Sequence, residues 1–342
     1  MKGIILHGGH GTRLRPLTHT GPKQLLKIAN KPMSQYALED LRDAGITNIA
    51  IIIGDVYPEK VKEFYGDGTK FGVKITYVFQ DQPKGIAHAI GLCRDFIADD
   101  KFVVYLGDNI LRTGLSSYVK NFEISSNDAQ ILLVEVENPS QFGVVEMKEN
   151  KIINIIEKPK IPPSNLAVIG VYFLTPKIFD VIKKLRPSWR KELEITEALQ
   201  LLMDSGLDIH HDYVTGWWKD TGTPKDILHA NQLILESLKN QENGIFIGDN
   251  CTIGSDAKIM GPVIIGDNCT IGSTTSLGPN VSIGKNSHLK NCNIKNSIVM
   301  DDCVICAPIK IIDSIISDGT EIKNNNSNES VYLLGERSKI SI

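Results

Sequence analysis

The chain has 342 residues, enough for two domains with buried cores, and 42% of them are hydrophobic and 23% charged, proportions that are typical of a globular protein. Its formal net charge is −3 at pH 7, so it lacks the basic excess that neutralises nucleic-acid phosphates, and we expect no nucleic-acid partner. No apolar run approaches the roughly 20 residues of a membrane-spanning helix, and neither a signal-peptide pattern nor a secreted cysteine framework is present, so we expect no membrane association and a cytoplasmic location.

The first thirty residues predict a phosphate-binding loop. A short apolar strand, Gly3–Leu6, leads into Gly8-Gly9-His10-Gly11-Thr12-Arg13, and Lys23 follows ten residues after the arginine. Glycines let backbone N–H groups approach phosphate oxygens, and arginine and lysine supply the positive charge that a triphosphate needs. The third glycine of the dinucleotide fingerprint and the Gly-Lys-Ser/Thr of the P-loop are both absent. We therefore interpret this segment as a nucleoside triphosphate site of another kind, with a surface turn as the alternative.

Up to about residue 240, short apolar strands alternate with amphipathic helices. This alternation predicts an α/β fold in which a mostly parallel, Rossmann-like sheet is covered by helices on both faces. The loop at Gly8, Gln80 and Asp108 each follow an expected strand, and ligands of such sheets bind at the carboxyl ends of the strands. We therefore expect these residues in a single site. The later strands are expected at Asn48–Ile53, Lys74–Gln80, Phe102–Leu106, Ile131–Val136 and Val168–Phe173, and helices at Pro32–Ala44, Gly85–Ile97 and Ile195–Asp204.

From Gly244 onward the period of the sequence changes. An aliphatic residue recurs every six positions from Ile247 to Leu289, and the spacing then slips to five or six. A period of six is typical of a hexapeptide-repeat parallel β-helix, in which the aliphatic side chains point inward. We therefore predict two domains, residues 1–240 and residues 244–342, and expect the second to serve stability and assembly into a homo-oligomer rather than chemistry.

Several motifs resemble those of the sugar-phosphate nucleotidyltransferases, and among these the long-type glucose-1-phosphate thymidylyltransferases. The resemblance rests on the pattern Gly-Gly-x-Gly-Thr-Arg-Leu…Pro-Lys-x-Leu and on later segments in the family's order. It implies a left-handed winding of the β-helix and transfer of a thymidylyl group from dTTP to glucose 1-phosphate, giving dTDP-glucose and pyrophosphate. The later segments are Tyr77–Gln80, Gly85–Ala89, Leu106–Asn109, Phe142–Val144, Glu157–Pro159, Ala167–Tyr172 and Trp218–Thr223.

The resemblance also implies a role for each polar residue of the site. Arg13 and Lys23 would bind the triphosphate of dTTP, Lys158 would bind the phosphate of glucose 1-phosphate, and Asp108 and Asp220 would hold Mg²⁺. The attacking phosphate oxygen is already an anion, so the reaction needs positioning and charge rather than a general base. The nucleotide contacts extend over Gly8, Gly9, His10, Gly11, Thr12, Gln80 and Gly85, and the sugar-phosphate contacts over Asn109, Gly143, Glu157 and Val168.

Two alternatives stay open. Gln80 and Gly85 would accept uracil nearly as well as thymine, so the enzyme could use UTP or another hexose 1-phosphate. A catalytically silent regulatory subunit of the same fold is the second alternative, although such a subunit would usually lack the loop arginine, the lysine or a metal-binding aspartate. His7 stands where relatives often have alanine, which leaves the pH dependence of the loop open.

Overall fold

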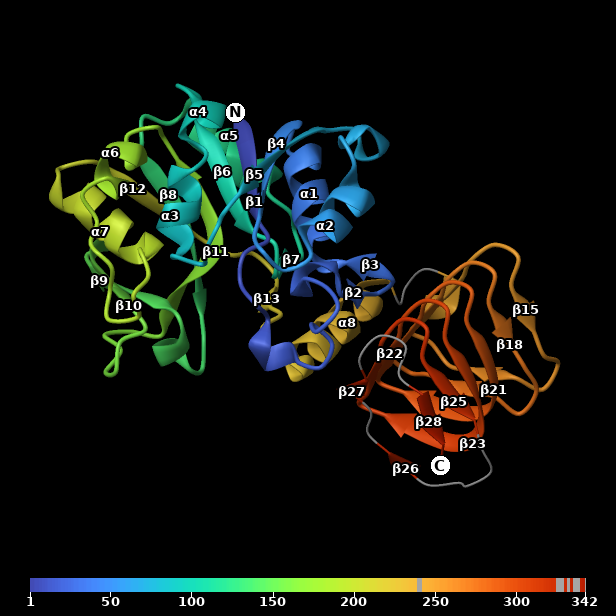
Figure 1. The fold of residues 1–342 in the computed structure, drawn as a ribbon. Helices are drawn as coiled ribbons and strands as arrows, with labels where there is room; N and C mark the ends of the chain where they lie inside the picture. Colours follow the sequence, from blue (N-terminus) through green and yellow to red (C-terminus); the bar gives the residue numbers. More distant parts are fainter. Residues whose placement is uncertain (239–241, 324–328, 331–332, 335–338, 342) are drawn as a thin grey trace. The chain divides into compact units, whose positions relative to one another are not determined.

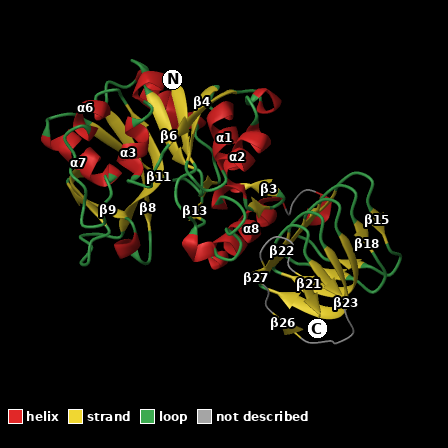
Figure 2. Cartoon of the chain, in the orientation of Figure 1, coloured by secondary structure: helices red, strands yellow, loops and turns green. Residues whose placement is uncertain are grey.

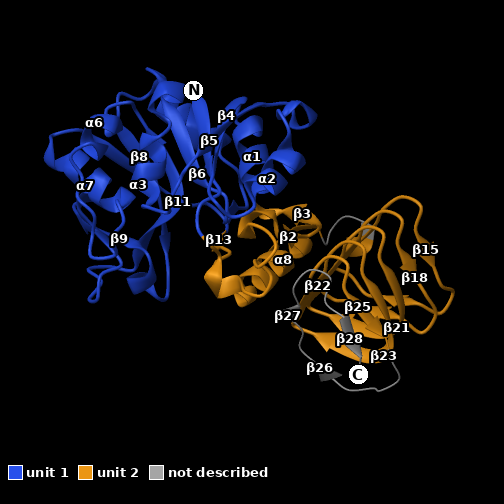
Figure 3. Ribbon diagram, in the orientation of Figure 1, with its two compact units in different colours: residues 1–9, 34–218 blue, residues 10–33, 219–342 orange. Residues whose placement is uncertain are grey.

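The computed structural model describes residues 1–238, 242–323, 329–330, 333–334 and 339–341. The chain forms two compact units (Figure 3). The sheet unit comprises residues 1–9 and 34–218, and the solenoid unit comprises residues 10–33 and 219–342. The N-terminal segment 10–33 therefore groups with the C-terminal part of the chain. The division into residues 1–240 and 244–342 stays a prediction, since it follows sequence period rather than contacts.

A nine-stranded sheet is the centre of the sheet unit (Figure 1). Its main path runs in the order β10-β9-β11-β6-β1-β4-β5, and β8 joins β11 and β12. The half formed by β6, β1, β4 and β5 is parallel, whereas β11 runs antiparallel to β6 and makes the whole sheet mixed. The strands are β1 (Lys2–Leu6), β4 (Asn48–Ile53), β5 (Lys74–Phe79), β6 (Phe102–Leu106), β8 (Ala129–Glu135), β9 (Gly143–Lys148), β10 (Lys151–Glu157), β11 (Leu166–Leu174) and β12 (Ile209–Tyr213).

Helices cover both faces of this sheet (Figure 2). On one face, Ile4 and Leu6 of β1 belong to a buried cluster that includes residues of α3, α6 and α7. On the other face, a Cβ at Gly3 would lie 3.0 Å from Leu41 Cδ1 of α1, and the Tyr105 hydroxyl donates to Asp40 Oδ2 at 2.9 Å. The helices are α1 (Met33–Asp43), α2 (Pro58–Tyr65), α3 (Ile86–Gly91), α4 (Arg94–Ile97), α5 (Ser116–Ile124), α6 (Ile178–Ile182) and α7 (Ile195–Asp204).

The solenoid unit joins the segment 10–33 and helix α8 (Pro224–Leu238) to a stack of parallel strands. The segment 10–33 contains two single turns of 3-10 helix, Thr12–Leu14 and Lys23–Leu25, and the hairpin of β2 (Lys27–Ile28) and β3 (Lys31–Pro32). The stacked strands are β14 (Ile245–Ile247), β15 (Thr252–Ile253), β16 (Lys258–Ile259), β17 (Val263–Ile265), β18 (Thr270–Ile271), β19 (Ser276–Leu277), β20 (Val281–Ile283), β21 (His288–Lys295), β22 (Ser297–Val299), β23 (Val304–Ile312), β24 (Ile315–Ile316), β25 (Glu321–Lys323), β26 (Glu329–Ser330), β27 (Leu333–Leu334) and β28 (Lys339–Ser341).

The register of the stacked strands explains the hexapeptide period. Ile265 lies opposite Ile283, eighteen residues further on, so one coil takes three hexapeptides. Ile283 lies opposite Val299 after only sixteen residues, and Val299 opposite Ile316 after seventeen. These shorter coils account for the slip in spacing that the sequence shows after Leu289.

The aliphatic repeat residues form the core of the stack from the second coil onward. Ile271 and Leu277, for example, are fully buried and belong to one apolar cluster. In the first coil the equivalent Ile253 is 37% exposed and Ile247 is 46% exposed, because that coil ends the stack. The C-terminal part is therefore a parallel-strand domain whose first coil is partly open to solvent.

Candidate functional site

Three of the predicted site residues lie at one edge of the parallel half of the sheet. Gly8 follows β1, Gln80 follows β5 directly, and Asp108 follows β6. Because these strands are parallel, their carboxyl ends meet at the same edge. A Cβ built at Gly8 would lie 3.4 Å from Gln80 Oε1, so the backbone of the glycine loop and the Gln80 amide are neighbours.

The Gln80 side chain is held by residues that follow it in the chain. It is 5% exposed, and its Nε2 lies 2.9 Å from His88 Nδ1 and 3.4 Å from Gly85 O. A carbonyl oxygen only accepts, so Nε2 donates to Gly85 O and His88 Nδ1 accepts the second amide hydrogen. Burial lowers the pKa of His88, which favours the neutral, accepting imidazole. The Oε1 acceptor is then directed toward Gly8.

Gly85 is fixed both by its backbone and by its surroundings. Its φ is +102°, and a Cβ there would lie 2.4 Å from the backbone oxygen of Leu193. Only glycine adopts this conformation without strain. The close approach to Leu193 therefore sets the start of α3, and with it the place of His88.

We expect Gly85→Ala to lower the free energy of unfolding by about 2–4 kcal/mol, because it adds overpacking to the cost of a positive φ. Gly45→Ala is the matched control, since Gly45 also has a positive φ, +86°, but nothing lies within 4 Å of its Cβ position. Urea unfolding of both variants measures the difference. Equal losses in the two variants would show that the Leu193 contact does not matter.

Asp108 is oriented by its neighbour Asn109. The Asn109 Nδ2 donates to Asp108 Oδ1 at 3.1 Å, while Asn109 Oδ1 accepts from Gly170 N at 3.2 Å and from Trp218 Nε1 at 2.7 Å. Asn109 is 3% exposed. The amide thus orients the Asp108 carboxylate, a role that sequence reasoning did not identify, and the sugar contact expected of Asn109 stays a prediction.

The predicted sugar-phosphate residues Gly143, Glu157 and Lys158 lie together in the β9–β10 hairpin. Gly143 is opposite Glu157 in the ladder, and the Lys158 ammonium is 3.8 Å from Glu157 Oε1. Lys158 has a φ of +42°. Val168, by contrast, lies in β11 opposite Leu133, next to a register shift. The hairpin therefore groups a cation and a carboxylate that are both expected to contact the sugar 1-phosphate.

Glu157 also belongs to a polar cluster that the sequence did not indicate. It accepts from Thr196 Oγ1 at 3.0 Å and from the Arg190 guanidinium at 3.3 Å. Arg190 in turn contacts Glu192 at 3.2 Å and the buried Glu194 at 3.3 Å. Burial and the Glu194 carboxylate raise the pKa of Glu157, and the Lys158, Thr196 and Arg190 contacts oppose that rise. Arg190 stands in a stretch without a recognisable motif, so no sequence signal marks it.

The solenoid unit holds the remaining six predicted residues. Gly11 has a φ of +59°, and its Cβ position is 2.9 Å from Thr18 Cγ2 and 3.4 Å from Lys23 Cβ. A Cβ at Gly222 would lie 2.9 Å from an Arg13 guanidinium nitrogen. Arg13 therefore lies against the backbone two residues after Asp220, and Lys23 lies against Gly11.

The segment after Asp220 is rigidly built. Thr221 is fully buried and its hydroxyl contacts Met33 Sδ at 3.0 Å. Thr223 caps α8, since its hydroxyl accepts from Asp226 N at 3.3 Å, and the Lys219 ammonium pairs with Asp226 at 2.7 Å. These contacts hold β13 (Trp218–Asp220) beside the start of α8.

His7 precedes the glycine loop and is buried. It is 4% exposed, and neither ring nitrogen has a hydrogen-bond partner among the described residues. Its ring meets Tyr65 edge-on, with centroids 5.9 Å apart. Burial, opposed by the Asp108 carboxylate, lowers the pKa of His7 from 6.5 to about 3. The imidazole is therefore neutral at physiological pH.

We expect His7 to make the protein less stable in mild acid. Between pH 6.5 and 3 the unfolded chain binds a proton that the folded chain does not. The free energy of unfolding therefore decreases as the pH is lowered, by up to about 1.4 kcal/mol per pH unit. His7→Ala should remove about 2 kcal/mol of the loss between pH 7 and pH 5 in urea unfolding. An unchanged loss in His7→Ala would show that the His7 imidazole does not cause it.

The predicted site residues belong to both compact units. Asp108, Gln80 and the residues of the β9–β10 hairpin lie in the sheet unit, while Arg13 and Lys23 lie in the solenoid unit. The remaining members of the solenoid-unit set are His10, Gly11, Thr12 and Asp220, and those of the sheet-unit set are Gly8, Gly9, Gly85, Asn109 and Val168.

Comparisons with known proteins identify the family of the chain. Residues 2–237 match the family described as Nucleotidyl transferase, and residues 259–341 match the GMPPB C-terminal domain. The low-salt glycan biosynthesis nucleotidyltransferase Agl11 of Haloferax volcanii is 49% identical over 94% of both chains. A glucose-1-phosphate thymidylyltransferase of Streptomyces antibioticus is 40% identical over 100% of this chain and 99% of its own.

A solved structure is also similar to the chain. It is a Bacillus anthracis protein solved with sucrose and provisionally assigned as a glucose-1-phosphate thymidylyltransferase; it is 44% identical and superimposes with a TM-score of 0.65 over 68% of this chain and 94% of its own. The family match covers more than half of the chain, and the relatives match it over nearly their full length. The chain therefore belongs to the nucleotidyl transferase family and is a sugar-phosphate nucleotidyltransferase.

Proposed function

We propose that this chain transfers a thymidylyl group from dTTP to glucose 1-phosphate, giving dTDP-glucose and pyrophosphate. The similarity to the Streptomyces antibioticus thymidylyltransferase over the whole chain supports this pair of substrates. The structural observation that carries the proposal is the hydrogen-bond acceptor, Gln80 Oε1, beside the backbone of Gly8. This acceptor bears on the choice of base, and the base distinguishes the proposed reaction from the same transfer with another nucleoside triphosphate.

Gln80 suits a base with a ring N–H. Its two amide hydrogens are engaged by Gly85 O and His88 Nδ1, so Oε1 is the group that meets a ligand. Thymine and uracil carry an N3–H donor, whereas cytosine and adenine have an acceptor at the equivalent position. If Gln80 Oε1 faced the ring acceptor of cytosine or adenine, two buried acceptors would lack a donor, which would weaken binding by about 1–3 kcal/mol. The amide therefore favours dTTP or UTP over CTP and ATP.

The phosphate chemistry requires charge rather than a base. The phosphate oxygen of the sugar 1-phosphate attacks the α-phosphorus of dTTP, and pyrophosphate leaves. In this proposal Lys158 binds the sugar phosphate, while Arg13 and Lys23 bind the triphosphate and stabilise the departing pyrophosphate. The three cations offset the repulsion between two anionic substrates and hold them in line for the displacement.

Asp108 and Asp220 are the residues that would hold Mg²⁺. The donor set fits the ion, because magnesium prefers one or two carboxylates together with phosphate oxygens. The Asn109 amide orients the Asp108 carboxylate, as expected of a metal ligand with a fixed neighbour. When bound, Mg²⁺ would neutralise charge on the transferring phosphate.

UTP is the second candidate nucleotide. Thymine and uracil share O4, N3–H and O2, and they differ only in the C5 methyl group, which the Gln80 amide does not read. A pyrophosphate-release assay with dTTP, UTP, CTP, ATP and GTP, each with glucose 1-phosphate and other hexose 1-phosphates, tests both candidates. The proposal expects dTTP with glucose 1-phosphate to give the highest kcat/KM. Faster turnover of any purine nucleotide would overturn it.

The proposal includes a left-handed winding of the stacked coils and a homo-oligomer that involves the solenoid unit. The open first coil supports the second point, because Ile247 and Met260 there are 46% and 65% exposed. Exposed apolar residues at the end of a stack favour association. Light scattering after size exclusion measures the assembly, and Ile247→Lys should weaken it if the first coil takes part.

A further inference from the structure

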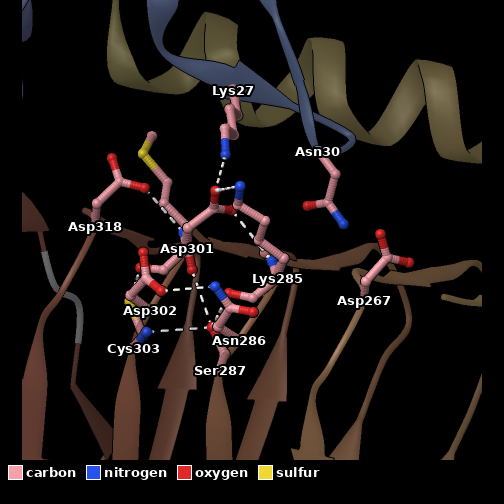
Figure 4. Close-up of polar contacts among 12 residues, drawn as sticks. Lys27, Asn30, Asp267, Lys285, Asn286, Ser287, Asp301, Asp302, Cys303 and Asp318 are labelled. Atoms are coloured by element: carbon pink, nitrogen blue, oxygen red, sulfur yellow. Dashed lines mark hydrogen bonds and ion pairs between the residues drawn. The ribbon is translucent and has the colours of Figure 1, made fainter. Parts of the chain in front are cut away.

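The segment that carries the loop cations is attached to the turns of the solenoid. The Lys27 ammonium contacts Asp301 Oδ2 across 274 residues of sequence (Figure 4). The two side chains are only 20% and 10% exposed. Lys285, on the neighbouring coil, is 4.0 Å from the same oxygen. This ion pair is more shielded from water than ordinary surface pairs, so its geometry is well defined.

Two further contacts fix the β2–β3 hairpin on the same part of the solenoid. Asn30 Nδ2 donates to the backbone oxygen of Ile283 at 2.7 Å. Asn231 of α8 bridges the two sides, because its Oδ1 accepts from Ala29 N at 2.9 Å and from Ser282 Oγ at 2.7 Å. These contacts and the ion pair together hold the hairpin at three points.

Asp301 is itself held by the coils on either side. Its Oδ1 accepts from Lys285 N at 3.2 Å, and its own N–H donates to Asp318 Oδ1 at 2.9 Å. Asp267, in the same column of turn residues, makes an equivalent backbone contact, since it accepts from Asp249 N at 2.9 Å. Asp301 therefore combines the turn contact of the column with a contact to the N-terminal segment.

The ion pair lies very close in sequence to a predicted catalytic cation. The turn Lys23–Leu25 ends one residue before Leu26, whose N–H donates to Lys23 O at 3.0 Å and whose oxygen accepts from Met33 N at 3.0 Å. Lys27 follows directly. Only Leu26 separates Lys27 from the turn Lys23–Leu25, so a displacement of Lys27 would also displace that turn.

We infer that Asp301 is a positioning residue of the transferase: by holding Lys27 it sets the place of Lys23, so that the affinity for the nucleoside triphosphate depends on the solenoid. The inference rests on the proposed function in assigning Lys23 to the triphosphate. It adds to the expected role of the C-terminal part, which was stability and assembly alone. A purely structural ion pair would change stability but would not change one substrate's KM selectively.

The test is steady-state kinetics on the full chain. Asp301→Asn keeps the shape of the side chain and removes its charge, and we expect the KM for dTTP to rise about fivefold or more while the KM for glucose 1-phosphate changes less than twofold. Asp267→Asn removes a carboxylate with the equivalent backbone contact and should leave both KM values unchanged. Lys27→Met should reproduce the effect of Asp301→Asn, and the double variant should be no worse than the poorer single variant.

The outcomes separate the inference from the proposed function. If the wild type turns over no nucleotide, the proposed function is wrong, and dTTP affinity by calorimetry then decides the inference through the same variants. If Asp301→Asn does not fold, Lys27→Met carries the test, because it leaves the coil contacts of Asp301 in place. Unchanged dTTP parameters in Lys27→Met, or equal changes for both substrates, would overturn the inference.

Discussion

Asp108→Asn is expected to remove nearly all turnover while the protein stays folded. The substitution keeps the size of the side chain, and Asn109 can still contact it, but it removes the negative charge proposed to hold Mg²⁺. Loss of such an electrostatic group typically costs a factor of about 100 or more in rate, equivalent to roughly 2.7 kcal/mol of barrier. Pyrophosphate release at saturating substrates and a thermal melt provide the two measurements.

A matched control comes from the same sheet unit. Asp212→Asn removes a partly buried carboxylate that accepts from Gln130 Nε2 at 2.9 Å, away from the predicted site residues. It should leave the rate within about twofold of the wild type. If Asp108→Asn retained more than about a tenth of the wild-type rate, a barrier change of about 1.4 kcal/mol or less, the assignment of Asp108 to the metal would be wrong.

The second large effect separates the two phosphates. We expect Arg13→Ala to impair mainly the use of dTTP and Lys158→Ala to raise mainly the KM for glucose 1-phosphate. Loss of a charge-assisted contact costs about 1.5–3 kcal/mol, so each effect should be at least about tenfold. Arg15→Ala and Lys160→Ala remove exposed cations two residues away in each case and should have little effect. Equal effects of both variants on both substrates would contradict these roles.

Gly222→Ala tests the Arg13 assignment without touching the arginine. The new Cβ would lie 2.9 Å from the guanidinium, which is the mobile end of a flexible side chain and can move aside. We expect dTTP use to fall severalfold with an unchanged melting temperature. A loss of stability without a change in dTTP kinetics would instead make Gly222 a structural glycine.

The sequence was most informative where a single local cause determines the structure. The bounds of β4 and β6 agree with the predicted strands, because strands buried on both faces are unbroken apolar runs. Similarly, the six-residue period of the aliphatic residues predicts their inward stack in the solenoid. The predicted helix Gly85–Ile97 is instead divided into α3 and α4 at Leu92 and Cys93, since Gly91 weakens the helix there.

Contacts between distant segments were not predictable in the same way. Arg190 meets Glu157 across 33 residues, and Lys27 meets Asp301 across 274. No sequence pattern around a single lysine or arginine in a polar stretch predicts which carboxylate it contacts. The role of His88 was easier to predict, because His88 lies in the same motif as Gly85. The grouping of the segment 10–33 with the C-terminal part depends on such contacts and so could not be read from periodicity.

The attachment at Asp301 limits how many coils the solenoid can have. A stack of eighteen-residue coils would by itself tolerate the gain or loss of a whole coil, since every aliphatic residue would keep its inward position. An added coil before Asp301 would nevertheless move its carboxylate by one strand spacing, about 4.8 Å, and separate it from Lys27. We therefore expect this contact to constrain the number of coils before Asp301 but not the number after Asp318.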